Sequence, residues 1–204
     1  MTEHIGEQLR DSGLLQEDAA RAGIYGLIAR LFYAAPDEDV LGVLLNSNAF
    51  EATGQPIALA WRDLVEAGRT ASPLDLENEH TGLFVGTGKA EVTPYLTHYT
   101  IKYATDNPLV ELRQQLTRWG MARRDNAHEP EDHVSGVCET MRFAIAVQHR
   151  TDEEQKSFFD RFLYRGGKAF CDAVSASPKA VFYREVAGFT RAFLEVEHEA
   201  FGML

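Results

Sequence analysis

The apolar residues of the chain recur with the spacing of amphipathic helices over most of its length. The first such stretch, 17–35, places its apolar side chains on one helical face and ends before Pro36. Further stretches of the same kind cover 37–45, 56–67, 72–84, 108–119, 129–148, 156–174 and 179–196. Strand-like alternation is scarce. We therefore predict an all-α fold, a single-domain helical bundle of about eight to ten helices over residues 1–204.

Two stretches depart from this periodicity. The longer one, 86–108, holds glycines, prolines and several rings, and a short helix is expected within 98–104. Long irregular stretches in a compact chain are more often functional than idle. The other departure is the pair Gly166 and Gly167, which predicts a kink in the penultimate helix because glycine weakens a helix interior.

Composition narrows the classes of function. The 204 residues carry a formal net charge of −11, which disfavours contact with phosphate backbones and suits a basic partner. The chain lacks the basic start and apolar run of a signal peptide, and no apolar run is long enough for a membrane span. We expect a soluble cytoplasmic protein that binds no nucleic acid, with Cys138 and Cys171 as buried apolar residues.

Motifs of catalysis are missing from the sequence. There is no G-x-S-x-G nucleophile motif, and neither cysteine has an obvious histidine partner in sequence. The stretch 86–89, Gly-Thr-Gly-Lys, follows a predicted helix and lacks the spacing of a P-loop, so it is interpreted as a turn. The sequence therefore favours a protein that is not an enzyme and that carries no cofactor.

A cluster of acidic residues opens the predicted helix 129–148, with the sequence Glu-Pro-Glu-Asp-His at 129–133. Acidic side chains stabilise a helix N-terminus, so this cluster is accounted for by helix stability alone or by function. Helical phase places Asp132 opposite the core face, His133 on the flank, and Glu139 and Phe143 on the side of Asp132. An apolar wall with a carboxylate rim suits a peptide that is basic at one end and apolar along its length.

The alternative to a peptide-binding protein is a metal-binding one. Two Glu-x-x-His pairs, Glu77 with His80 and Glu195 with His198, have the spacing used by helical di-iron carboxylate proteins. With this composition about one such pair is expected by chance. The second pair also lies in a charged run near the chain end, which is typical of a solvated, fraying terminus.

A family pattern is spread over three short stretches: EHTGLFVGTG at 79–88, PYLTHY at 94–99 and EPEDH at 129–133. Together they resemble the TorD/DmsD/NarJ family of redox-enzyme maturation chaperones, whose pattern reads E-Y-x-x-L-F-x-G-P-G, P-P-W-E-S-V-Y and E-P-D-D-H. The resemblance implies an all-helical chaperone that binds the twin-arginine signal peptide of a molybdenum or tungsten oxidoreductase. Such a chaperone holds the apo catalytic subunit back from export until its cofactor is inserted.

The resemblance also implies a site. Carried over by position, the candidate signal-peptide residues are Leu83, Pro94, Tyr95, Tyr99, Pro130, Asp132 and His133, to which helical phase adds Glu139. Where the pattern has Pro, Trp and Glu, this chain has Thr87, Tyr95 and Leu96, and Glu131 replaces an Asp. The G-x-G-K-x-E-V form is similar to a subgroup associated with formate dehydrogenases. Relatives imply a monomer or a domain-swapped dimer.

This interpretation has two spatial requirements. One is that the Asp132 carboxylate is not buried in an internal ion pair, and the other concerns two segments of the chain. The start of the helix after Pro130 and the turn that contains Tyr95 must come together to form a cleft for an arginine-bearing leader.

Overall fold

The computed structural model describes residues 16–46, 54–86, 90–103, 106–122 and 129–204, and these are helical almost throughout. The α-helices are α2 (Gln16–Tyr33), α3 (Glu38–Asn46), α4 (Pro56–Thr70), α5 (Pro73–His80), α6 (Pro108–Arg118), α7 (Val134–Ala146), α8 (Asp152–Phe158), α9 (Tyr164–Ala176) and α10 (Phe182–Gly202). Shorter π and 3-10 turns are η1 (Thr81–Val85), η2 (Leu96–Tyr99) and η3 (Phe159–Leu163). The all-α prediction is confirmed.

Local sequence explains the starts of α4, α5, α6 and α8. Proline occupies the first turn of α4, α5 and α6, where its missing N–H costs nothing. The Ser72 side chain accepts a hydrogen bond from the Asp75 N–H at the start of α5, and Thr151 and Glu154 form a capping box at α8. These four helix starts therefore follow from short-range chemistry within the sequence.

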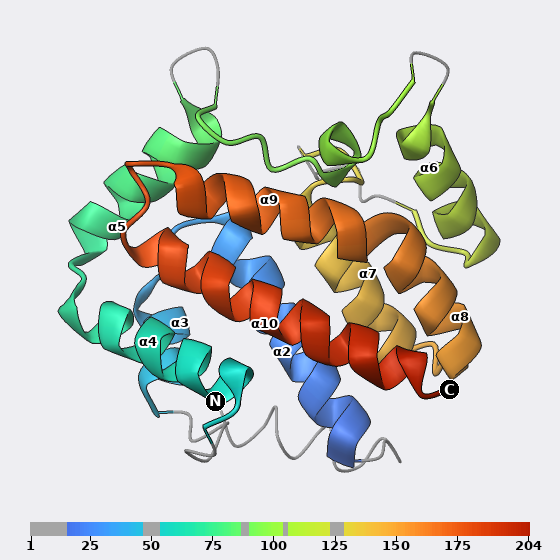
Figure 1. The fold of residues 1–204 in the computed structure, drawn as a ribbon, viewed down its shortest axis with the longest axis horizontal. Helices are drawn as coiled ribbons and strands as arrows, with labels where there is room; N and C mark the ends of the chain where they lie inside the picture. The colour runs from blue at the N-terminus through green and yellow to red at the C-terminus, as the bar shows by residue number, and fades with distance from the viewer. Residues whose placement is uncertain (1–15, 47–53, 87–89, 104–105, 123–128) are drawn as a thin grey trace.

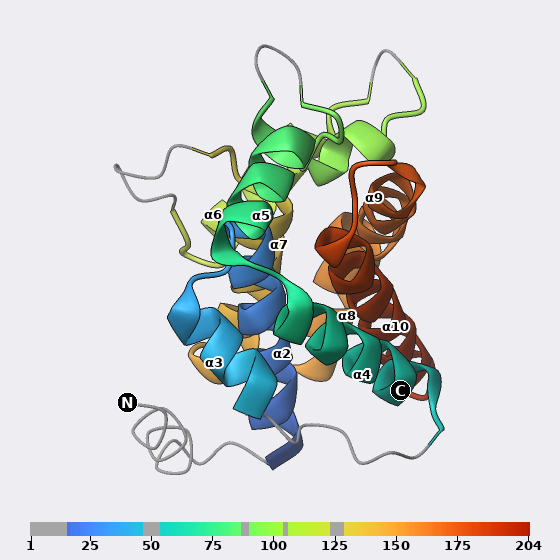
Figure 2. The same cartoon turned by 90° about the vertical axis from the view of Figure 1, so that its left-hand side faces the viewer.

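The helices lie in two layers around a common core. α9 and α10 run side by side across the front of the molecule in Figure 1, and α2 packs against α7 behind them. The turned view in Figure 2 places α9 and α10 on one side and α2 and α7 on the other, with α4 lying against α10. None of the described helices is long and apolar enough to cross a bilayer.

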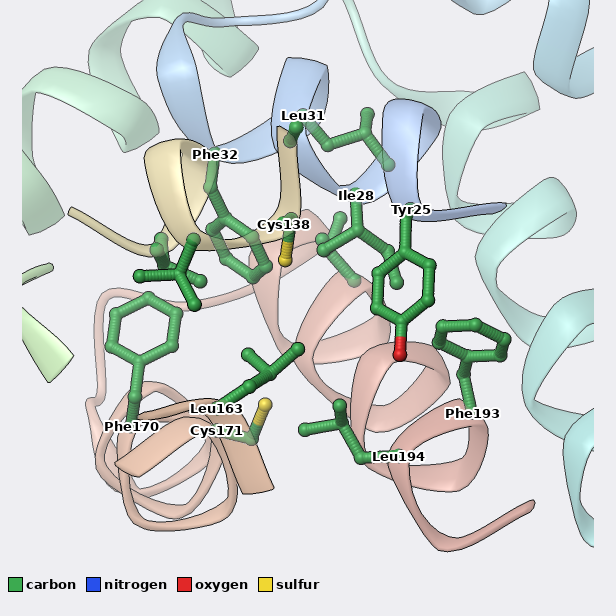
Figure 3. Packing of buried hydrophobic residues seen from close by; sticks show 14 of the residues in the cluster. Tyr25, Ile28, Leu31, Phe32, Cys138, Leu163, Phe170, Cys171, Phe193 and Leu194 are labelled. Carbon is green, nitrogen blue, oxygen red and sulfur yellow. The ribbon is translucent and has the colours of Figure 1, made fainter. Parts of the chain in front are cut away.

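Aromatic and aliphatic side chains from α2 fill the space between the layers. Figure 3 shows Tyr25, Ile28 and Phe32 directed from α2 toward Phe170 of α9 and Phe193 of α10. Phe32 meets Phe170 edge-on at 5.0 Å between ring centroids, and Tyr25 meets Phe193 in the same way at 4.9 Å. These contacts hold the two layers together.

The two cysteines are free thiols in this core, as the sequence predicts. Burial raises the pKa of the Cys171 thiol to about 12 and raises that of Cys138 further. Both therefore remain protonated and act as small apolar residues.

The expected kink in the penultimate helix lies elsewhere. Gly166 and Gly167 are inside the regular helix α9, whereas the irregular turn is η3, which separates α8 from α9. Gly166 instead permits close packing, because a Cβ built there would lie 2.9 Å from the carbonyl oxygen of Leu96. The kink prediction was wrong, because Gly166 allows η2 to pack closely against α9 and does not bend the helix.

The end of the chain is also more ordered than the sequence suggests. The charged run predicted to fray belongs to α10, where Glu197 is only 2% exposed and Phe201 is buried. Arg21 of α2 donates to both carboxylate oxygens of Glu197, at 2.8 and 2.9 Å, and the Tyr25 hydroxyl donates to Oε2 at 2.8 Å. A buried ion pair with its hydrogen bonds therefore fixes this terminus.

Candidate functional site

The two segments required to meet do lie side by side. Tyr95 and His133 form an isolated antiparallel β-bridge, the one β pairing within the described ranges. Around it, the Leu96 N–H donates to the Asp132 carbonyl and the Val134 N–H donates to the Pro94 carbonyl, each at 2.9 Å. The expected proximity of the two segments is confirmed.

Side chains reinforce this bridge. The Tyr95 hydroxyl donates to Glu129 Oε2 at 2.8 Å, and its ring meets the His133 ring edge-on at 5.8 Å. Burial, helped by the neighbouring Glu129, raises the pKa of Tyr95 to about 12. Tyr95 therefore stays neutral and holds Glu129 in place as a hydrogen-bond donor.

Because of this bridge, the long helix begins later in the chain than predicted. α7 begins at Val134, not at Glu129, because the backbone groups of Asp132 and Val134 are already paired with the Tyr95 segment. His133 is the N-cap, and its Nδ1 accepts a hydrogen bond from the Ser135 N–H at 3.2 Å. The residues from 129 to 133 therefore form a turn and not the first turn of a helix.

Asp132 consequently points inward, contrary to the helical-phase prediction. It is 4% exposed, and its carboxylate accepts a hydrogen bond from the Thr97 hydroxyl of η2. Helical phase was the wrong basis for its direction, because Asp132 lies outside the helix. In this structure the carboxylate fastens η2 to the turn before α7.

Beside this junction lies a cavity of about 780 Å³. Its walls come from the last turns of α2, the end of α6 and the residues after it, the turn 129–133, and one face of α7. Its lining includes the charged or aromatic residues Arg30, Tyr33, Glu129, Glu131, Glu139, Arg142 and Phe143. The cavity has the size of common ligand pockets.

The wall of the cavity has an apolar part. Tyr33 of α2 is 57% exposed and Phe143 of α7 is 37% exposed, which leaves ring surface open to solvent. Leu116 and Met121 add aliphatic surface. The sequence pattern predicted the exposed position of Phe143 and missed Tyr33, whose place at the end of an apolar helical run gave no sign of exposure.

Carboxylates line the same cavity, and each has a partner within the chain. Glu129 accepts from Tyr95, Glu131 pairs with Arg113 at 3.0 Å, and Glu139 pairs with Arg142 at 2.7 Å. The cavity therefore combines an acidic rim with an apolar wall, and its carboxylates have guanidinium or hydroxyl partners.

The candidate residues fall into two groups in this geometry. Pro130, His133 and Glu139 line the cavity, and Tyr95 reaches its edge through Glu129. Leu83 and Pro94 are buried, as is Asp132.

Tyr99 is half-buried and turns toward the protein. Its hydroxyl donates to the Thr93 carbonyl at 2.9 Å, and its ring packs on Phe170 at 6.2 Å between centroids. Leu83, Pro94, Tyr99 and Asp132 therefore do not line the cavity.

The first family stretch has a structural role that sequence reasoning did not find. The Glu79 carboxylate accepts hydrogen bonds from the backbone N–H groups of Val181, Phe182 and Tyr183, at 2.8, 3.1 and 2.8 Å. These are donors at the start of α10, which lack partners within the helix. Glu79 thus caps a helix that begins about a hundred residues later in the chain, a distance of 102 to 104 positions.

The di-iron alternative is not supported by the placement of its ligands. Among the described residues, no group of three or more His, Cys, Asp or Glu side chains is arranged to hold a metal ion. His80 contacts the Phe32 carbonyl and the rings of Phe84 and Tyr183, while Glu195 bonds to Tyr164 and Lys168. The two Glu-x-x-His pairs are therefore engaged in separate structural contacts.

Comparison with known proteins points in one direction. A family model for the nitrate reductase delta subunit matches residues 51–172, which include all three stretches of the sequence pattern. The chaperone protein TorD of Shewanella loihica is 27% identical over 202 residues, covering 90% of this chain and 93% of its own. TorD of Aliivibrio fischeri is 24% identical over 64% of this chain and 66% of its own length.

A solved structure shares the fold. The crystal structure of an Archaeoglobus fulgidus protein described as a redox enzyme maturation protein matches with a TM-score of 0.55 and 19% identity. The match covers 86% of this chain and 93% of that one. The likeness extends over most of the helical arrangement.

Proposed function

The chain belongs to the nitrate reductase delta subunit family, and from this we propose that it is a redox-enzyme maturation chaperone that binds the twin-arginine leader of its client. The client is the apo catalytic subunit of a molybdenum or tungsten oxidoreductase, with a formate dehydrogenase as the favoured candidate. The chaperone performs no catalysis and holds the client in the cytoplasm until cofactor insertion is complete.

The single observation that carries this proposal is the composition of the cavity beside α7. Glu129, Glu131 and Glu139 offer carboxylates to the paired arginines of a leader, and a guanidinium binds a carboxylate through short, charge-assisted hydrogen bonds. Tyr33 and Phe143 offer ring surface to the apolar stretch that follows those arginines.

The bridge between Tyr95 and His133 gives this site its shape. It fixes the turn that carries Glu129 and Glu131 against the start of α7, so the acidic rim is held by backbone hydrogen bonds. A rim fixed before the ligand arrives loses less conformational entropy on binding. The family's paired stretches thus act together as the scaffold and the lining of one site.

The proposal is tested by calorimetric titration, at a low and a high salt concentration, with a synthetic peptide that has two adjacent arginines followed by an apolar stretch. Glu139→Gln is expected to weaken binding about tenfold and to reduce its salt dependence, because one charge-assisted contact is lost. Phe143→Ala is expected to weaken binding at both salt concentrations, since it removes apolar contact.

Two controls accompany the titration. Glu66→Gln removes the same charge from an exposed pair with Arg69 on α4, outside the cavity lining, and should leave binding unchanged. A peptide with two lysines should bind more weakly, because lysine cannot pair in bidentate fashion. The absence of peptide binding by the unaltered protein at either salt concentration would overturn the proposal.

A further inference from the structure

Glu139 is paired with a guanidinium from its own chain. Arg142, one turn later on α7, contacts Glu139 Oε2 through Nε at 2.8 Å and through Nη2 at 2.7 Å. Both residues line the cavity, and their side chains are 41% and 47% exposed. The guanidinium group that an arginine of a ligand would bring to Glu139 is thus already present within the protein itself.

The stem of Arg142 lies against the neighbouring helix α2 at a glycine. Gly26 of α2 faces its aliphatic stem, and a Cβ built at Gly26 would lie 2.9 Å from Cδ of Arg142. Gly23, one turn earlier on the same helix, has open space at the corresponding point. Glycine inside a helix is unfavourable relative to alanine. At position 26 the missing side chain leaves space that the stem of Arg142 occupies.

From these contacts we propose that Arg142 is an internal competitor at the site. In the ligand-free protein it occupies the place on Glu139 that a leader arginine takes, and binding exchanges one guanidinium for another. This inference rests on the proposed function, and it adds a residue that lowers the affinity for the client.

The exchange is physically easy. An exposed ion pair between residues three apart on a helix is weak, so the pair between Arg142 and Glu139 opens at small cost. After opening, the positive charge of Arg142 remains near an incoming guanidinium and repels it. Both effects lower the affinity for a cationic leader, which favours release of the client once it is mature.

A double-mutant cycle tests the exchange with the same twin-arginine peptide. Arg142→Gln is expected to tighten binding about three- to tenfold, because Glu139 loses its competitor and the site loses a positive charge. In the Glu139→Gln background, Arg142→Gln should tighten binding by a smaller factor, about twofold, because the competition is gone and only the repulsion by the positive charge remains to be removed.

A matched control separates local exchange from the change in net charge. Arg69→Gln removes one positive charge from a pair of the same spacing, with Glu66 on α4, and it should leave the affinity unchanged. The free-state pair is checked independently by crystallography of the unliganded and peptide-bound protein. Arg142 is expected to leave Glu139 Oε2 only in the bound form.

The outcomes distinguish this inference from the proposed function. If the peptide binds the unaltered protein and Arg142→Gln weakens it, Arg142 contacts the ligand directly and the inference is overturned. An unchanged affinity, or an equal gain in the Glu139→Gln background, also overturns it while leaving the proposed function intact. If neither the unaltered protein nor Arg142→Gln binds the peptide, both proposals fall.

Discussion

At the scale of single residues, Asp132 contributes to the site from the interior. Its carboxylate is buried and accepts a hydrogen bond from Thr97, so it ties η2 to the turn that carries the acidic rim. A buried carboxylate that loses a donor keeps its full desolvation cost. Asp132 is therefore expected to act on binding through the position of the rim.

The first prediction concerns this contact. Thr97→Val should lower the free energy of unfolding by about 1–3 kcal/mol, measured by urea denaturation at neutral pH, because Asp132 loses the hydroxyl donor. Thr117→Val is the control, since the Thr117 hydroxyl donates to an exposed backbone carbonyl on α6, and its effect should stay within about 0.5 kcal/mol. An Asp132→Asn protein of unchanged stability that no longer binds peptide would contradict this role.

His133 gives the site a pH dependence. Burial lowers its pKa below 6.5, against the opposing effect of Glu129 and Asp132 and with a small contribution from His80 in the same direction as burial. Its Nδ1 accepts the Ser135 N–H, and that contact is lost when the nitrogen carries a proton. The neutral form of His133 is thus the one that caps α7.

The second prediction follows from the sign of this shift. Below about pH 6.5 the unfolded chain takes up a proton at His133 that the folded protein refuses, so stability falls with pH until the lower folded pKa is reached. The slope from this histidine is at most about 1.4 kcal/mol per pH unit. Urea denaturation at pH 7.5 and 5.5 measures it.

His133→Asn provides the comparison, because asparagine is a good N-cap that does not titrate. It should reduce the loss of stability between the two pH values without abolishing it, since burial also lowers the pKa of His80. An equal loss in the variant and the unaltered protein would show that His133 does not titrate in this range.

Residue types and spacing were sufficient to predict which segments meet beside the cavity, and they were insufficient for the direction of the side chains there. Glu139 and Phe143 lie within α7, so helical phase placed them correctly on the cavity side. Asp132 lies in a turn whose backbone pairs with a segment 36 to 40 positions away along the chain, namely Val134 with Pro94 and Asp132 with Leu96. Long-range pairing of this kind leaves no periodic pattern in the sequence.

At the scale of elements, the same distinction separates what was predicted from what was not. Helices with strong apolar periodicity and a proline at one end were predicted within a few residues, as for α4 and α6. The π turns η1 and η3 were not, because they continue the helical pattern with one extra residue in a turn. The glycines of α9 were interpreted from helix propensity alone, which takes no account of the segment packed against them.

The third prediction uses those glycines. Gly166→Ala should destabilise the protein by about 1–3 kcal/mol, because the new Cβ would meet the Leu96 carbonyl oxygen at 2.9 Å and displace η2. Gly188→Ala in α10 has open space and should stabilise the protein by up to about 1 kcal/mol. Thermal unfolding of both variants measures the contrast.

The same pair of variants also tests whether η2 supports the site. Because η2 carries Thr97 and directly follows Tyr95, Gly166→Ala should weaken binding of the twin-arginine peptide, whereas Gly188→Ala should not. Stabilisation by both alanines would mean that α9 and η2 separate without cost.

At the scale of the whole molecule, polar contacts join parts of the chain that are far apart in sequence. Glu79 caps α10, and Arg21 of α2 pairs with Glu197 near the end of α10. Arg21 also donates to Gln155 of α8 at 3.1 Å, so one guanidinium joins three helices. Charge composition alone suggested a solvated terminus here, because it carries no information about a partner 176 positions away.

The last prediction concerns this ion pair. Glu197→Leu should lower the free energy of unfolding by about 3–5 kcal/mol, because the Arg21 guanidinium, 15% exposed, loses its buried carboxylate and keeps only that of the more exposed Asp18. The double variant Arg21→Met with Glu197→Leu should be less destabilised than Glu197→Leu alone, since no buried charge remains uncompensated. Chemical denaturation of the two single variants and the double variant gives the coupling energy.

The exposed pair of Arg69 and Glu66 sets the scale for comparison, and Arg69→Gln should cost less than about 1 kcal/mol. Strictly additive losses in the double variant would mean that Arg21 and Glu197 act independently, each through its other contacts. Strong coupling would instead mean that the ion pair is the unit of stability. In that case α2, which carries Arg21 near its start and Tyr33 of the cavity at its end, is held in place at the site by contacts made with the end of the chain.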